Sequence, residues 1–211
     1  MKGVFISLEG IEGTGKSTQT RLLSEHLRKQ GHEVVQTLEP GGTAIGMKIR
    51  EILLSLESGE MDPVTELLLY NASRVQHLCQ VVIPALQRGS VVITDRFSDS
   101  TVAYQGYGRG IDLTLLDSLD EIATGRLRPD LTILLDIEVE TGLMRNRQAN
   151  KRDRLELEDI RFHEKVRRGF LDIAGSDPGR FRVIPCTGSI DEVQARVAEA
   201  AGQFLKSCAR A

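Results

Sequence analysis

Short apolar runs alternate along the chain with longer amphipathic segments. Runs rich in β-branched residues predict five strands, at residues 4–8, 33–37, 91–94, 131–135 and 181–184. Apolar residues at helical spacing predict helices between them, at residues 17–30, 46–56, 64–88, 113–124 and 189–208. Strands this apolar are typically covered on both faces. The pattern therefore predicts an α/β fold, with a mostly parallel sheet and helices on both of its faces.

Glycines and prolines mark the joints between these segments, and no linker, repeat or low-complexity tract interrupts them. With 211 residues the chain is long enough to bury a proper core and too short for two comfortable domains. We therefore expect one domain over residues 1–211. In open parallel sheets the ligand lies beyond the carboxyl ends of the strands, so functional motifs should cluster there.

The composition argues against several classes of protein. A formal net charge of −3 and a pI near 5.9 argue against broad nucleic-acid or membrane-surface binding. Cys79, Cys186 and Cys208 are far apart and odd in number, which disfavours a disulfide framework or a zinc site. The sequence enters its first strand at once and has no apolar run of membrane-spanning length, so we expect a cytoplasmic protein.

The segment after the first predicted strand has the form G-x-x-x-x-G-K-S, from Gly10 to Ser17. Its glycines allow backbone N–H groups to turn inward around an anion, and the following helix points its positive end at the same anion. Lys16 adds a charge for the terminal phosphates, and Ser17 offers a hydroxyl to magnesium. The alternative, a plain glycine turn, needs neither side chain. The segment predicts binding of a nucleoside triphosphate.

The third predicted strand ends in Asp95-Arg96. On the ligand side of the sheet, Asp95 can hold magnesium through water and Arg96 can clamp a phosphate oxygen. Alternatively, Asp95 caps the next helix and pairs with Arg96. The phosphate-binding loop favours the functional interpretation.

Two further segments suit recognition of a base and a sugar. Tyr70 and Arg74 lie one helical turn apart, so an aromatic ring and a guanidinium share one face. A lone tyrosine is more often part of a core. Residues 98–106 supply hydroxyls and an amide directly after Asp95-Arg96.

A basic run, Arg145, Arg147, Lys151, Arg152 and Arg154, follows the fourth predicted strand. Such runs are usually solvated helix faces. In a phosphate-binding fold a mobile cationic flap can close over transferring phosphates, and we favour that interpretation. The same stretch spells N-K-x-D at 150–153, and D-x-x-G follows at 172–175. GTPases have these motifs in the opposite order, each after a buried strand, so we interpret both as chance matches.

Six ordered motifs resemble those of bacterial thymidylate kinases over nearly the whole chain. They are Leu8 to Thr18, Glu39-Pro40-Gly41-Gly42-Thr43, Tyr70 to Gln76, Asp95-Arg96-Phe97, Ala103-Tyr104-Gln105-Gly106 and Asp153-Arg154-Leu155-Glu156. The resemblance implies a P-loop containing nucleoside triphosphate hydrolase fold with five parallel strands. It also implies ATP as the phosphoryl donor, Mg²⁺ as the cofactor, dTMP as the acceptor in dTTP biosynthesis, and a homodimer.

The resemblance also implies roles for individual residues. The loop residues expected to hold ATP are Gly10, Ile11, Glu12, Gly13, Thr14, Gly15, Lys16, Ser17 and Thr18. Glu12 approaches the acceptor sugar, and Glu9 with Asp95 organises magnesium together with Ser17. The expected acceptor contacts are Arg50, Arg74 and Arg96 to the phosphate or base, Tyr70 stacked on thymine, Tyr104 against the sugar carbon without a hydroxyl, and Thr101 and Gln105 near the base.

Two positions depart from the family pattern. Leu38 replaces an Arg that commonly precedes Glu-Pro-Gly-Gly, and Ala149 stands where a catalytic Arg of the lid, about residues 145–156, is expected. Lys151 or Arg152 is the expected substitute, and we assign Arg152 to catalysis with Lys16, Arg96, Asp95 and Glu12.

The expected mechanism needs no strong general base, because the acceptor phosphate is already mostly a dianion at neutral pH. Cations and magnesium offset repulsion between the two nucleotides. The alternatives are another nucleoside monophosphate kinase, a deoxynucleoside kinase or, from a different class, a P-loop GTPase switch.

Overall fold

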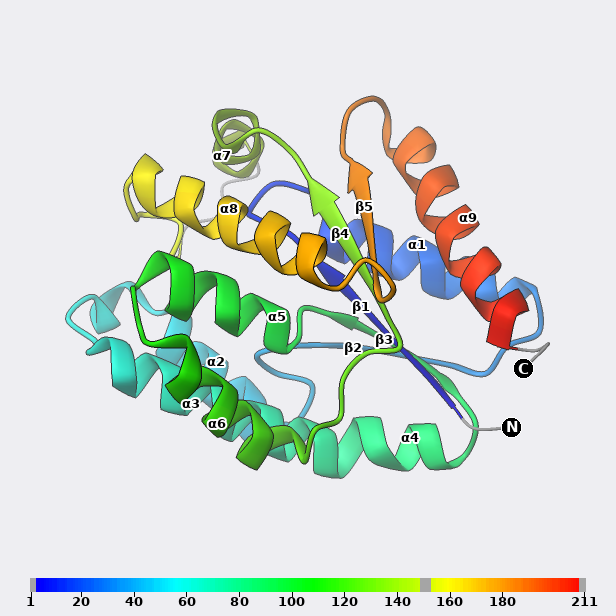
Figure 1. Ribbon diagram of the computed structural model, residues 1–211, viewed down its shortest axis with the longest axis horizontal. Helices are drawn as coiled ribbons and strands as arrows, with labels where there is room; N and C mark the ends of the chain where they lie inside the picture. The colour runs from blue at the N-terminus through cyan, green and yellow to red at the C-terminus, as the bar shows by residue number, and fades with distance from the viewer. Residues whose placement is uncertain (1–2, 149–152, 209–211) are drawn as a thin grey trace.

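The structure is a computed structural model that describes residues 3–148 and 153–208. One sheet of five parallel strands runs through the centre, in the order β2-β3-β1-β4-β5 (Figure 1). The strands are β1 (Val4–Glu9), β2 (Val34–Leu38), β3 (Val91–Asp95), β4 (Leu131–Asp136) and β5 (Phe181–Pro185). Each predicted strand is present, and the predicted fold is confirmed.

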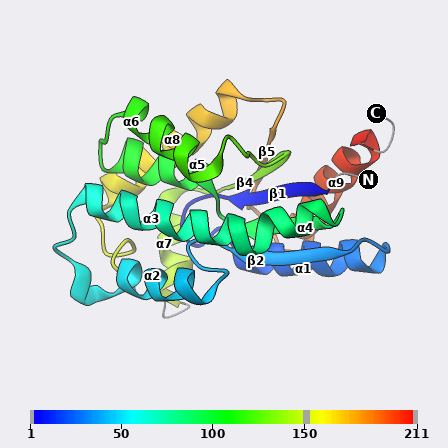
Figure 2. The same cartoon turned by 90° about the horizontal axis from the view of Figure 1, so that it is seen from below.

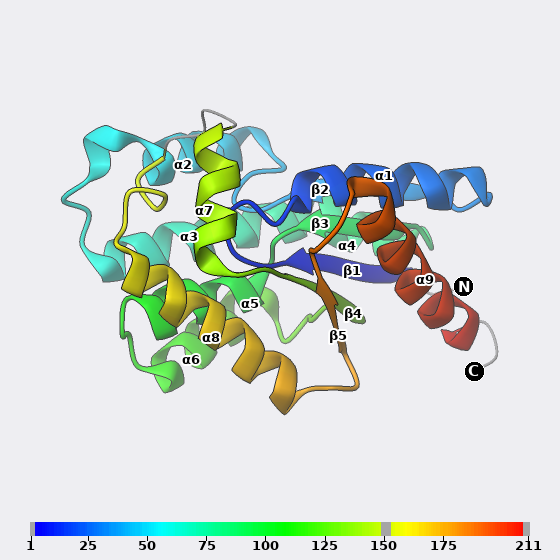
Figure 3. The ribbon, with the colours of Figure 1, turned by 90° about the horizontal axis from the view of Figure 1, so that it is seen from above.

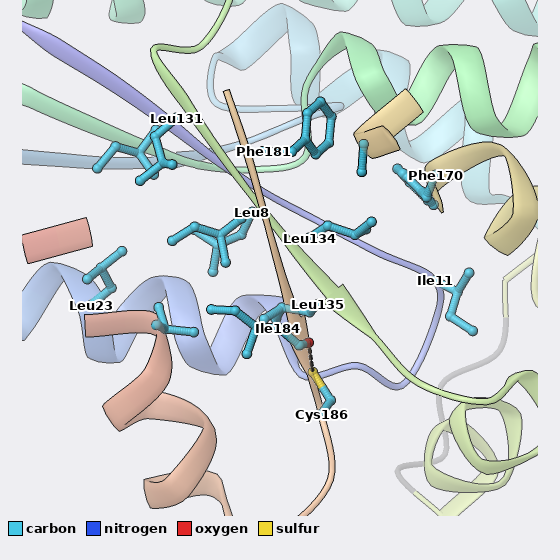
Figure 4. Packing of buried hydrophobic residues seen from close by; sticks show 14 of the residues in the cluster. Leu8, Ile11, Leu23, Leu131, Leu134, Leu135, Phe170, Phe181, Ile184 and Cys186 are labelled. Atoms are coloured by element: carbon cyan, nitrogen blue, oxygen red, sulfur yellow. Dashed lines mark hydrogen bonds between the residues drawn. The ribbon is translucent and has the colours of Figure 1, made fainter. Parts of the chain in front are cut away.

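The strands lie where they do because both faces of the sheet are covered. In β1, Phe5 packs with Val92 in a cluster on one face, while Ile6 and Leu8 belong to a larger cluster. Figure 4 shows the larger cluster around Leu8 and Leu134, with Leu23 of the first helix to one side and Phe170 to the other. Near-continuous apolar strands are what a doubly covered parallel sheet requires.

Two helices cover one face. Helix α1 (Lys16–Lys29) follows the loop after β1, and α9 (Ile190–Cys208) packs beside it (Figure 1). Their inward faces carry buried apolar residues at helical spacing, Leu23 and Leu27 in α1 and Val193 and Val197 in α9.

The other helices lie on the opposite face and beyond the carboxyl ends of the strands (Figures 1 and 2). They are α2 (Ala44–Leu54), α3 (Pro63–His77), α4 (Ile83–Gln87), α5 (Ser98–Thr101), α6 (Leu113–Thr124), α7 (Val139–Gln148) and α8 (Ile160–Ser176), with a 3-10 turn η1 (Leu56–Ser58). Side-chain caps begin several of them: Asp62 accepts from the N–H of Val64 at 2.8 Å, and Asp159 accepts from the N–H of Phe162 at 2.8 Å.

The helix predicted over 64–88 is present but contains a π-helical turn, η2 (Leu78–Val82), between α3 and α4. Pro84 explains the turn, because proline lacks an N–H donor and clashes with the carbonyl four residues back. The wider turn lets the N–H of Ile83 reach the carbonyl of Leu78, five residues back.

Three helical segments were not predicted: α5 with the π-helical stretch η3 (Val102–Gly108) that continues it, α7, and α8. Helix α7 and the α5–η3 segment are polar for much of their length, so their sequences show no clear stripe of apolar residues from which a helix could be predicted. In α8 the stripe exists, as Phe162, Val166 and Phe170 at four-residue spacing. Among the described residues, no helix is both long and apolar enough to cross a membrane.

Candidate active site

The predicted motifs meet in one pocket of about 630 Å³. The pocket lies at the carboxyl ends of β1 and β3, as expected for an open parallel sheet. The sequence-predicted residues that line it are Glu12, Gly13, Gly15, Lys16, Ser17, Thr18, Arg50, Tyr70, Arg74, Asp95, Arg96, Thr101, Tyr104 and Gln105. Segments up to 144 positions apart in the sequence, from Glu12 to Glu156, therefore contribute to a single site.

The phosphate-binding loop keeps its shape through glycines and internal hydrogen bonds. Gly10, Gly13 and Gly15 have φ values of 140°, 73° and 86°, which side-chain-bearing residues rarely adopt. A Cβ on Gly13 would lie 2.0 Å from the carbonyl oxygen of Gly142, so α7 touches the loop, as Figure 3 shows. Of the predicted loop residues, Gly10, Ile11 and Thr14 shape the loop and do not line the pocket.

Lys16 lies at the start of α1, where the helix presents free N–H groups towards the pocket. Its ammonium donates to the carbonyl of Ile11 at 2.7 Å. Burial, reinforced by the nearby charge of Arg96, lowers the pKa of Lys16 to about 8, although Asp95 and Glu12 act against this. A triphosphate would add further negative charge and favour the protonated form.

Ser17 and Asp95 form the candidate magnesium site. The hydroxyl of Ser17 donates to the carboxylate of Asp95 at 2.5 Å. Asp95 therefore faces the phosphate-binding loop and does not cap the following helix, whose first residue has no side-chain cap. Hydroxyl and carboxylate oxygens are the donors that Mg²⁺ prefers, so the two residues fit the cation.

Glu9 lies behind this pair and does not line the pocket. Its buried carboxylate accepts from the N–H of Phe97 at 2.7 Å and from the hydroxyl of Ser100 at 2.6 Å. Burial and the charge of Asp99 raise the pKa of Glu9 to about 8. The structure gives Glu9 a supporting place, and its predicted part in organising magnesium stays a prediction.

Arg96 lies at the centre of the site in a strained conformation. Its φ of 74° falls in the left-handed region, which non-glycine residues seldom adopt outside functional sites. Its guanidinium donates to the carbonyl of Gly10, the hydroxyl of Ser100 and the hydroxyl of Tyr104, each at 3.0 Å. Burial acts to lower its pKa, but Tyr104 and the surrounding carboxylates outweigh burial and keep Arg96 charged.

Glu12 is held by groups from three elements. One carboxylate oxygen accepts from the hydroxyl of Tyr104 and from Arg96 at 3.2 Å, and the other lies 3.3 Å from Nδ1 of His163. Burial acts to raise the pKa of Glu12, but His163, Arg96 and Lys16 lower it to about 2. Glu12 is therefore an anion at neutral pH. No motif pointed to His163, a buried residue of α8.

Arg74 is buried and fixed on several sides. Its Nε donates to Glu39 at 2.9 Å, its Nη2 donates to Thr101 at 2.8 Å, and it lies over the ring of Phe97 at 5.3 Å. The other oxygen of Glu39 is 2.8 Å from Nδ1 of His77. The glutamate of the Glu-Pro-Gly-Gly motif, Glu39, thus sets the orientation of Arg74 in the pocket.

Arg50 and Leu38 both line the pocket. Arg50 donates to the carbonyl of Pro40 at 2.9 Å. Other lining residues that were not assigned to the site are Glu39, Pro40, Leu54, Phe97, Ser100, Arg145, Asn146, Asp153, Leu155 and Glu156.

The described members of the basic run lie in separate surroundings, and the interpretation of the run as one mobile flap stays a prediction. Arg145 and Arg147 belong to the last turn of α7, and Arg145 donates to the carbonyl of Cys186 at 3.3 Å. Arg154 is buried and paired with Glu66. Residues 149–152, which include Ala149, Lys151 and the predicted catalytic Arg152, lie outside the described residues. The D-x-x-G match lies inside α8 and does not follow a strand.

The site thus combines an anion cradle and an oxygen pair suited to Mg²⁺ with a group of aromatic, cationic and amide side chains in the same pocket. We call the part of the pocket lined by Tyr70, Arg74, Tyr104 and Gln105 the second chamber. Two anionic ligands can lie here with cations between them.

Known proteins with similar sequences and structures share one description. A family model described as thymidylate kinase matches residues 8–197. A thymidylate kinase of Geobacter sulfurreducens is 49% identical over 203 residues, covering 93% of this chain and 95% of the relative. One of Syntrophotalea carbinolica is 48% identical and covers 92% of each chain. A crystal structure of thymidylate kinase from Ehrlichia chaffeensis matches with a TM-score of 0.79 and 34% identity, over 95% of this chain and all of that one.

Proposed function

The chain belongs to the thymidylate kinase family and transfers the γ-phosphoryl group of ATP to dTMP, giving dTDP and ADP, and we propose here how its residues divide this work. One observation supports the division: the phosphate-binding loop, Asp95-Arg96 and the chamber around Tyr70 and Tyr104 open into the same pocket.

The phosphate-binding loop binds the donor. Backbone N–H groups of residues 13–18 and the N-terminus of α1 would surround the β- and γ-phosphates, and the ammonium of Lys16, which lines the same pocket, would pair with them. Ser17 and Asp95 hold Mg²⁺, which when bound neutralises charge on the donor phosphates. Glu9 supports this arrangement by fixing Ser100 and the backbone at Phe97.

The second chamber binds dTMP. The ring of Tyr70 stacks on thymine, and Thr101 and Gln105 lie at the base edge. Glu12 accepts a hydrogen bond from the sugar hydroxyl, while the ring of Tyr104 packs against the sugar carbon that lacks one. Arg96, with Arg74 and Arg50 nearby, binds the acceptor phosphate or base edge.

Catalysis in this arrangement is mainly positioning and charge compensation. The acceptor phosphate is mostly a dianion at neutral pH and needs no strong base. Repulsion between donor and acceptor is the main obstacle, and Lys16 and Arg96 offset it where charge gathers during transfer. Asp95 therefore acts through the metal and not by taking a proton.

We propose one nucleoside monophosphate kinase domain, with the lid at about residues 145–156, acting in the cytoplasm, where its three free cysteines remain reduced. Exposed apolar side chains on neighbouring helices support a homodimer: Ile45 and Ile52 on α2, and Val64, Leu68 and Val75 on α3.

A test of the residue roles compares Arg96→Met with wild type in a coupled ADP-release assay. Arg96 contacts both chambers, so we expect kcat/KM for dTMP to fall by at least about 100-fold, as for loss of a transition-state charge contact. A change in the KM for ATP alone would contradict the assignment.

A further inference from the structure

Glu66 is a buried carboxylate that none of the roles above uses. It lies in α3 one turn before Tyr70 and two turns before Arg74, so the three share one helix face. Its side chain is fully buried, while Tyr70 and Arg74 line the pocket. A buried carboxylate without access to water must be compensated by hydrogen bonds and ion pairs, so the side chains that pair with Glu66 indicate what it does.

The partners of Glu66 are three side chains from two segments, η3 with its C-terminal cap Arg109, and the segment that contains Arg154. Oε1 accepts from Nε2 of Gln105 at 2.7 Å and from Nε of Arg109 at 3.3 Å. Oε2 accepts from Nη2 of Arg109 at 3.3 Å and pairs with Arg154. Burial acts to raise the pKa of Glu66, but the hydrogen bonds from Arg109 and Gln105 lower it, so the group is a carboxylate that can only accept.

This chemistry fixes the orientation of the Gln105 amide. Nitrogen and oxygen of a side-chain amide are nearly alike in shape, and only their partners decide which way the group points. A carboxylate cannot donate, so the NH₂ group must face Glu66. Gln105 lines the pocket, and its oxygen is then the amide atom available there.

Thr101 complements this orientation. Its hydroxyl oxygen already accepts from Arg74 at 2.8 Å, so its proton is free to donate elsewhere. Beside an acceptor at Gln105, the pocket then offers a donor at Thr101. Thymine presents an N3–H donor next to a carbonyl acceptor, whereas cytosine presents an N3 acceptor next to an amino donor.

We propose that Glu66 is a specificity-positioning residue: it holds the amide of Gln105 so that Oε1 accepts the N3–H of thymine and disfavours cytosine. The inference rests on the proposed place of Gln105 beside the base. Without the carboxylate, the amide can rotate and offer its NH₂ group to the N3 acceptor of cytosine.

The test measures kcat/KM for dTMP and for dCMP in the same enzyme preparation. Their ratio does not depend on the fraction of enzyme that is folded. Glu66→Gln keeps the size of the side chain but can donate, so we expect the ratio to fall roughly 10- to 100-fold, the range for misdirecting one buried hydrogen bond. Glu158→Gln is the matched control, because Glu158 pairs with Arg109 at 2.6 Å but does not contact Gln105. Its ratio should stay at the wild-type value.

Gln105→Met separates this inference from the proposed function. If Gln105→Met lowers the ratio and Glu66→Gln does not, the positioning role of Glu66 is overturned and the place of Gln105 stands. If Gln105→Met leaves the ratio unchanged, Gln105 does not read the base. The proposed place of Gln105 beside the base and the positioning role of Glu66 then both fail. A competition experiment with N3-methyl-dTMP uses only the wild-type enzyme and so does not depend on whether a variant folds. N3-methyl-dTMP should bind at least about 100-fold more weakly than dTMP, because its N3 carries a methyl group and cannot donate. Equal binding of the two nucleotides would overturn the proposal.

Discussion

Removing one hydroxyl, in Tyr104→Phe, tests how the acceptor sugar is held. In the wild-type protein this hydroxyl donates to Glu12 and accepts from Arg96 at 3.0 Å. The ring itself is held separately, with ring centroids 6.2 Å from Phe162 and 6.1 Å from Phe170. The substitution therefore deletes the polar contacts and keeps the aromatic wall.

The expected magnitude follows from these contacts. A hydrogen bond to a charged group contributes about 1.5–3 kcal/mol. Glu12 and Arg96 remain 3.2 Å apart and still pair, so the two losses do not add in full. We expect a loss of about 2 kcal/mol, or roughly 30-fold in kcat/KM for dTMP, because Glu12 is no longer aligned on the sugar hydroxyl.

The assay follows ADP release with dTMP and with ribothymidine monophosphate as acceptors. Preference for the deoxynucleotide should persist, since the ring still fills the space that a second hydroxyl would need. Tyr107→Phe is the control, because Tyr107 lies in the same π-helical stretch but does not line the pocket, and it should keep full activity. Unchanged kcat/KM in Tyr104→Phe, or loss of the deoxynucleotide preference, would refute the reasoning.

Four other perturbations follow from the same structure. Asp95→Asn should raise the magnesium concentration needed for half-maximal activity, and full activity at every magnesium concentration would contradict the metal assignment. Lys16→Met should lower kcat by at least about 100-fold with little change in the KM for dTMP, and a pure KM effect would count against it. The pKa of Glu9 is raised from 4.5, so the folded state holds a proton that the unfolded chain releases. The free energy of unfolding, measured in urea, should therefore fall as pH rises from about 5 towards 8, and Glu9→Gln should flatten that slope; an identical slope in both proteins excludes Glu9 as its source. Finally, dUMP should be a poorer but real substrate, because a methyl group in an apolar pocket is worth only about 1–3 kcal/mol, and complete rejection of dUMP would contradict a simple apolar contact.

The sequence predicted the features that depend on local geometry. The five strands are short apolar runs, and the phosphate-binding loop requires glycines at φ values that few other residues adopt. The Asp95-Arg96 pair was found because it follows a strand in a sheet whose ligand side is known in advance. Each of these signals lies within a few residues of the feature that it predicts.

The missed features depend on contacts between distant segments. His163 reaches Glu12 across 151 positions of sequence, and Glu66 reaches Gln105 across 39. Nothing near either residue marks it as part of a site, since burial of a polar side chain becomes visible only once the elements are packed. Helix α7 is polar along most of its length, and the contacts that position it, Gly142 against the loop at Gly13 and Val139 and Leu143 against the core, become visible only once the elements are packed.

Acceptor specificity tests the central claim most directly. A phosphoryl-transfer assay with ATP and Mg²⁺ should offer thymidine, dTMP and the other nucleoside monophosphates as separate acceptors. We predict dTDP formation from dTMP at a kcat/KM well above that for every other acceptor, and no phosphorylation of thymidine. Phosphorylation of thymidine but not of dTMP would contradict the account.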